Sequence, residues 1–151
     1  MAEVGSAGPA NGMPAAGEPD GRLLHLMARV SGILAALASD IRRRPGVARV
    51  LHECNVSGDE HVSNFEAYLE VHADSGSYVC LWFDLGCHVE AGWSVGASVL
   101  AAGAVGAPQE VLERHPETAC ADVATVEHAA LAAIEWLVAQ ADRLEHLGDR
   151  P

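Results

Sequence analysis

The sequence predicts an α+β fold, a two-layer sandwich in which an N-terminal and a C-terminal helix pack on one face of a four-stranded antiparallel meander sheet (α-β-β-β-β-α). Two patterns predict it. Apolar residues recur at steps of three and four near both ends of the chain, whereas apolar and polar residues alternate through its middle. The chain has 151 residues and is 50% hydrophobic, so it is long and apolar enough to bury one core.

The first twenty residues differ in composition from the rest of the chain. They are rich in Gly, Ala and Pro, and they lack the basic and apolar segments of a secretory signal. We expect residues 1–20 to form a disordered tail and residues 21–148 to form a single α+β domain. Without a signal or a long apolar run, a cytoplasmic protein with reduced cysteines and no membrane contact is expected. All nine basic residues are Arg and Ala is abundant, which favours a bacterial origin.

The first helix is expected from about residue 21 to residue 44, with Asp20 as its N-cap. Arg42, Arg43 and Arg44 would occupy its last turn, where cations suit the helix dipole, and Pro45 and Gly46 would end it. One face of this helix is apolar and carries Leu23, Leu26, Met27, Val30, Ile33, Leu34, Leu37 and Ile41.

Four strands are expected at 47–56, 64–72, 78–85 and 88–100, joined by short polar turns that favour antiparallel neighbours. In the last three strands one set of alternating residues is apolar, which predicts a half-buried sheet. The first strand is ambiguous, because either of its two sets of alternating residues could face the core. The residues expected to face the core are Phe65, Ala67, Leu69, Val71, Val79, Leu81, Phe83, Val89, Ala91, Trp93, Val95, Ala97 and Val99.

Residues 101–122 are rich in Ala and Gly and then polar, so we expect a loop there, with at most a short helical turn near Val111 and Leu112. The second helix is expected from about residue 126 to residue 147, with Thr125 as its N-cap and Gly148 ending it. Together with the first helix it can cover only one face of the sheet, which leaves the opposite face in water.

The negative charge is concentrated in the middle of the chain. The formal net charge is −12, and residues 50–113 contain ten acidic residues and no Arg or Lys. Phosphate backbones require a basic footprint, so this balance argues against nucleic acid as a partner. No glycine-rich phosphate loop and no nucleophile motif are present, so neither a cofactor nor catalysis is expected.

Acidic and aromatic side chains share the outward face of the predicted sheet. Carboxylates can steer a cationic partner while aromatic rings supply contact area, so this face is a candidate docking surface for a basic protein or peptide. The alternative interpretation is a solvated face that keeps the protein soluble, and pairing with a second copy is also open. The candidate partner-binding residues are Glu66, Tyr68, Glu70, Tyr78, Trp82, Asp84 and Glu90, with Glu53 as a further member.

A metal-dependent enzyme is the alternative of a different class. His52, Cys54 and Cys80 are the candidate ligands, because imidazole and thiolate groups suit zinc. Their spacing matches no established zinc motif, and paired carboxylates such as Glu66 and Glu70 would stay ionised on an exposed strand.

The layout of two helices on an antiparallel sheet resembles bacterial toxin-immunity proteins and type III secretion chaperone-like domains. Both classes bind a protein or peptide without catalysis. The resemblance is one of layout alone, and it implies a non-catalytic binding domain. The acidic surface adds the expectation that the domain blocks or holds a cationic partner segment.

Overall fold

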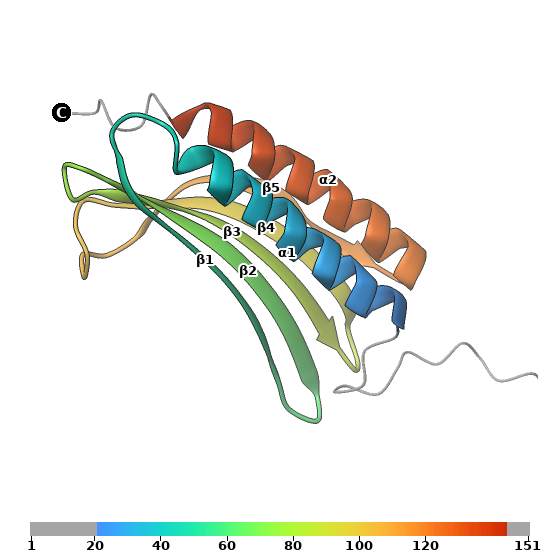
Figure 1. The fold of residues 1–151 in the computed structure, drawn as a ribbon. Coiled ribbons are helices and arrows are strands. Elements are labelled where there is room, and N and C mark those ends of the chain that lie inside the picture. The colour runs from blue at the N-terminus through green and yellow to red at the C-terminus, as the bar shows by residue number, and fades with distance from the viewer. Residues whose placement is uncertain (1–20, 145–151) are drawn as a thin grey trace, which may run out of the picture.

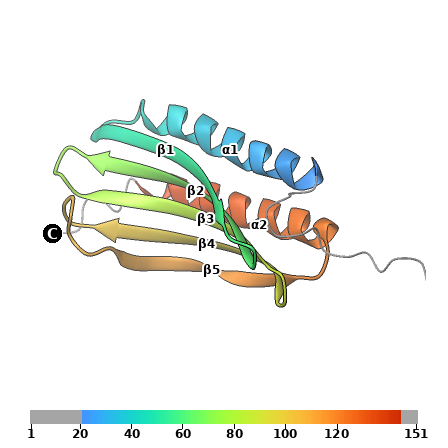
Figure 2. The ribbon, with the colours of Figure 1, turned by 90° about the horizontal axis from the view of Figure 1, so that it is seen from below.

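The structure is a computed structural model, and it describes residues 21–144. Two helices and one sheet form two layers, with both helices on the same face of the sheet (Figure 1). Figure 2 shows the strands side by side in chain order, β1-β2-β3-β4-β5, and all neighbours are antiparallel. The elements are α1 (Gly21–Ile41), β1 (Val47–Gly58), β2 (Val62–Ala73), β3 (Tyr78–His88), β4 (Gly92–Ala102), β5 (Glu110–Cys120) and α2 (Val123–Asp142).

The α+β class and the antiparallel sheet with a helix at each end are confirmed, but the sheet has five strands rather than four. Residues 110–120, expected as part of a loop, form the edge strand β5. This strand lacks an apolar period, and only Leu112 and Cys120 pack with the core. Its pairing with β4 holds it in the sheet instead. In addition, Glu113 forms an ion pair at 3.0 Å with Arg143, which lies just beyond α2.

The expected core face of β2 and β3 is confirmed, and β4 contributes its predicted residues from Trp93 onward. The first strand is no longer ambiguous, because Val50 is buried and lies opposite Val71 of β2. The even-numbered residues of β1 therefore face the helices. Val89, Glu90 and Ala91 were expected within a strand, but they form the turn between β3 and β4. The core residues from the sheet are Val50, Phe65, Ala67, Leu69, Val71, Leu81, Phe83, Leu85, Cys87, Trp93, Val95, Ala97, Val99 and Cys120.

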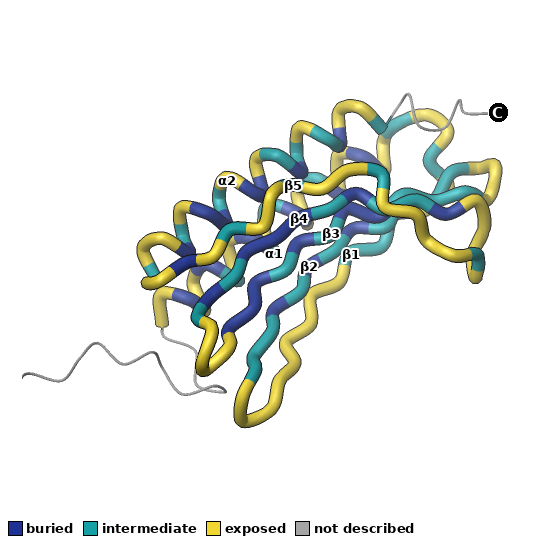
Figure 3. Tube along the Cα trace, turned by 180° about the vertical axis from the view of Figure 1, so that it is seen from behind, coloured by how far each residue is buried: buried dark blue, intermediate teal, exposed yellow. Residues whose placement is uncertain are grey.

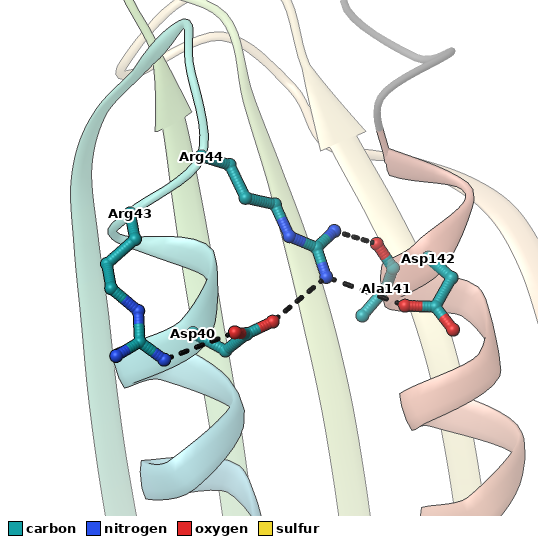
Figure 4. A network of polar contacts seen from close by, with 5 residues as sticks. All are labelled: Asp40, Arg43, Arg44, Ala141 and Asp142. Atoms are coloured by element: carbon teal, nitrogen blue, oxygen red, sulfur yellow. Dashed lines mark hydrogen bonds and ion pairs between the residues drawn. The ribbon is translucent and has the colours of Figure 1, made fainter.

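Helix α1 packs through six buried side chains, Leu23, Leu26, Val30, Leu34, Ala38 and Ile41. It ends at Ile41, so the three arginines follow the helix instead of forming its last turn. Arg44 reaches across to the end of α2 and donates to the carbonyl of Ala141 at 2.7 Å (Figure 4). Among the described residues, α1 is the one helix long and apolar enough to cross a membrane by length and composition.

The N-cap of α2 is Asp122 rather than Thr125. The Asp122 carboxylate accepts hydrogen bonds from the backbone N–H and the hydroxyl of Thr125, each at 2.7 Å. The helix ends at Asp142, before the predicted end near residue 147. The expected tail, the Asp20 cap and the Gly148 stop lie outside the described residues.

The β1–β2 hairpin projects beyond the helices. In Figure 1 the sheet bends away from the helix layer toward this hairpin, so its open face is concave. Figure 3 shows the hairpin half of β1 as exposed, and residues 53–58 all fall in the exposed class. The curved open face and this projecting strand are therefore the two large surfaces that the helices leave uncovered.

Candidate functional site

The open face of the sheet is formed by the residues that alternate with the core. The strand register places Glu66 opposite Asp84, and Tyr68 opposite Trp82. Five carboxylates and three aromatic side chains meet there, and we call them the acidic face. Its members are Glu53, Glu66, Tyr68, Glu70, Tyr78, Trp82, Asp84 and Glu117.

A stacked pair of rings lies in the middle of the acidic face. Tyr68 and Trp82 stack with centroids 5.3 Å apart and an interplanar angle of 5°. The Tyr68 hydroxyl donates a hydrogen bond to the Glu53 carboxylate on the neighbouring strand. That hydrogen bond, burial and the nearby carboxylates raise the pKa of Tyr68 to about 12, so the phenol stays a neutral donor. These contacts fix both rings as a rigid apolar platform between carboxylates.

A second ring pair lies further along the same strands. His72 stacks on Tyr78 at 5.0 Å, and its Nε2 lies 3.1 Å from the Glu70 carboxylate. Gln109, just before β5, donates to the Tyr78 hydroxyl at 3.0 Å. Cys80 lies in the strand register between the two ring pairs and is only 1% exposed. Cys80 is therefore shielded from water although no helix covers this face.

Asp84 lies in a shallow hollow of about 480 Å³ that is open to solvent. Its carboxylate fits above Gly96 of β4, where a Cβ atom would come within 2.8 Å of Oδ1. Trp82, Arg114 and Glu117 are also among the lining residues. Burial raises the pKa of the Asp84 carboxyl, Glu117 and Glu66 raise it further, and Arg114 opposes them. No described residue donates a hydrogen bond to this carboxylate.

Six of the seven predicted partner-binding residues lie together on this face, and Glu53 joins them as expected. Glu90 does not, because it lies in the exposed turn between β3 and β4. Sequence reasoning missed Glu117, Arg114 and Gln109, since all three belong to the segment expected as a loop. The stacking of His72 on Tyr78 was not predicted either.

The three alternative metal ligands do not converge. His52 Nε2 lies 3.6 Å from the thiol of Cys54, and both side chains belong to the helix-facing set of β1. Cys80 belongs to the opposite face, and burial raises the pKa of its thiol to about 12, so it is not a thiolate ligand at neutral pH. Across the described residues, no three His, Cys, Asp or Glu side chains form a group that could hold a metal ion.

Comparison with known proteins adds no relative. No protein-family model, no curated protein and no solved structure matches this chain. The functional interpretation therefore depends on the geometry of its own residues.

Proposed function

We propose that this protein is a non-catalytic binding domain that docks a cationic protein or peptide on its acidic face. The observation that carries the proposal is Asp84, a half-buried carboxylate held beside Trp82 without a hydrogen-bond donor among the described residues. A buried charge without a partner lowers the stability of a fold. Arg114 offsets the charge of Asp84 without donating a hydrogen bond to it, so a Lys or Arg side chain entering the hollow would supply the missing donor and lie along the Trp82 ring.

The arrangement of the other groups favours the same kind of ligand. The Tyr68–Trp82 platform is rigid, so contact with it orders few side chains. Glu53, Glu66 and Glu70 surround it on the open face, and β2 and β3 contain no Lys or Arg. Carboxylates in this position raise the association rate of a basic partner and reject an acidic one.

The mechanism is occlusion. The partner's basic segment would lie across the concave face, with one cationic side chain in the Asp84 hollow and its apolar surface on the ring platform. A cytoplasmic partner of this kind would be blocked or held in place without any covalent step.

The competing explanation is that the charge serves solubility alone, and two matched variants separate the two. The first variant, Glu66→Gln with Glu70→Gln and Asp84→Asn, removes three charges from the acidic face. The second makes the same change at the three turn residues Glu60, Asp74 and Glu90, which are exposed and off the face. The net charge of the two variants is identical.

Association with a fluorescently labelled peptide rich in Lys and Arg would be followed by stopped flow at low and physiological salt. We expect the face variant to associate about tenfold more slowly at low salt and to lose most of its salt dependence. The turn variant should stay close to the unmodified protein. Equal slowing by both variants would mean that only the net charge matters, and it would refute the docking proposal.

A further inference from the structure

The two edges of the sheet differ in how well they are protected against pairing with another strand. Edge strands usually carry prolines, bulges or basic side chains that prevent such pairing. β5 has all three: Pro116, Arg114 and two shifts of register against β4. In β1 the one shift lies between Val47 and Arg49, and residues 50–58 pair regularly with β2 and contain no Pro, Lys or Arg.

Two hydrogen bonds reveal which backbone groups of β1 point away from the sheet. Asp59 N–H donates to the carbonyl of Val62 at 2.8 Å, so the odd-numbered residues of the regular stretch bond to β2. The even-numbered residues therefore point outward. A contact of Arg42 supports this assignment. Its guanidinium lies outside the sheet and donates a hydrogen bond to the carbonyl of Val50 at 3.2 Å, so this carbonyl points away from β2. The next outward groups along the strand belong to His52, Cys54 and Val56.

The side chains beside this edge form two different strips. On the helix-facing side lie the half-buried His52 and the exposed Cys54 and Val56, and Val56 is 69% exposed. On the open side lie Glu53 and Asn55, which continue the acidic face to the edge. An added strand would therefore meet a weakly polar strip on one side and a carboxylate on the other.

We propose that the free edge of β1 pairs with an extended segment of the cationic partner, which becomes a sixth strand of the sheet. Its alternate residues would be basic, facing Glu53 and the acidic face, and apolar, facing Val56. Main-chain hydrogen bonds to His52, Cys54 and Val56 would hold it, and the side-chain pattern would select it. The inference deepens the docking proposal and depends on it for the charge of the partner.

Charge favours this occupant over a second copy of the chain. Each copy carries a net charge of −12, so two copies repel one another, whereas a basic segment is attracted to Glu53 and its neighbours. Pairing of β1 with β1 of another copy is thus the competing outcome, and sedimentation of the protein alone would reveal it as a dimer.

Proline at position 54 provides a direct test. Cys54→Pro removes an outward N–H and leaves the ladder to β2 intact, because the bonds to β2 come from the odd-numbered neighbours. Cys54→Ala is the matched control, since it removes the same thiol but keeps the N–H. Val56→Pro and Val56→Ala form a second pair, used if thermal unfolding shows that Cys54→Pro does not fold.

The probe is a short synthetic peptide in which Lys and Val alternate, titrated into the isotopically labelled protein under reducing conditions. We expect the amides of His52, Cys54 and Val56 to become protected from hydrogen exchange. The Pro variant should bind about tenfold more weakly, and the Ala variant should bind like the unmodified protein. A peptide of the same composition with Lys and Val in separate blocks should protect none of these amides.

Three results would overturn the inference: no binding of the alternating peptide, equal binding by the Pro and Ala variants, or a dimer that protects the same amides without peptide. The docking proposal is judged separately by the face variant. If the face variant loses binding and Cys54→Pro keeps it, the docking proposal stands and the added strand is refuted. If Cys54→Pro loses binding and the face variant keeps it, the added strand stands and docking on Glu66, Glu70 and Asp84 is refuted.

Discussion

Arg44 joins the ends of the two helices, and its removal should weaken the fold more than its position in a turn suggests. The side chain is 18% exposed, and one guanidinium nitrogen donates to the carbonyl of Ala141 at 2.7 Å. The other approaches Asp40 at 3.4 Å and Asp142 at 3.5 Å (Figure 4). The substitution Arg44→Ala removes all three contacts.

The magnitude follows from the kind of each contact. A hydrogen bond from a charged donor contributes about 1.5–3 kcal/mol, and Ala141 lies in the last turn of α2, where a cation also suits the helix dipole. The two aspartates are exposed, so their ion pairs with Arg44 add little. We therefore expect Arg44→Ala to lower the free energy of unfolding by about 2 kcal/mol.

Urea unfolding followed by circular dichroism measures the effect. For a domain of this size, the loss corresponds to a fall of about 1 M in the urea midpoint with an unchanged slope. Arg43→Ala is the control, because Arg43 is 75% exposed and contacts Asp40 alone among the described residues. An equal shift for both variants would show that the link to α2 contributes nothing and would refute the reasoning.

Three further outcomes are expected. Asp84→Asn should stabilise the protein at neutral pH, because the pKa of this carboxyl is raised in the folded state. The gain in the free energy of unfolding should shrink as the pH falls through that pKa toward 3.8, and unfolding measured at a series of pH values would follow it. Asp122→Ala should lower the melting temperature by a few degrees at pH 7, because it removes the N-cap of α2. The pKa of the Asp122 carboxyl is lowered in the folded state, so the difference in melting temperature between the two proteins should be lost below pH 3.8. A difference that does not depend on pH would contradict the capping role. In the native protein Cys54 should react rapidly with a disulfide reagent while Cys80 stays protected. Mass spectrometry of the labelled peptides would identify the modified thiol. Equal labelling of both thiols would contradict the burial of Cys80 in the acidic face.

The sequence determined β2, β3 and β4 most clearly, because strands with one buried face alternate between apolar and polar residues. Phe65, Leu81 and Val95 are core residues as the alternation predicts. β5 could not be found in this way. An edge strand is held by hydrogen bonds to β4, and its residues Arg114, Pro116 and Glu117 carry no apolar period.

The candidate site was predictable as far as it depended on alternation within one strand. That reasoning assigned Tyr68 and Trp82 to one face, and the register then made them neighbours. Glu90 was misplaced because β3 runs to His88 and the chain turns before β4 begins at Gly92. The hollow at Asp84 depends on three strands, so no pattern within a single strand could indicate it.

Gly96 shapes the acidic face without contributing a side chain. The Asp84 carboxylate occupies the space that a Cβ atom at position 96 would need, since the distance to Oδ1 would be only 2.8 Å. Even alanine there would force the Asp84 carboxylate to move from its present position. In the proposed docking surface, the position of the Asp84 carboxylate therefore depends partly on a missing methyl group, at a position where a search for functional side chains finds none.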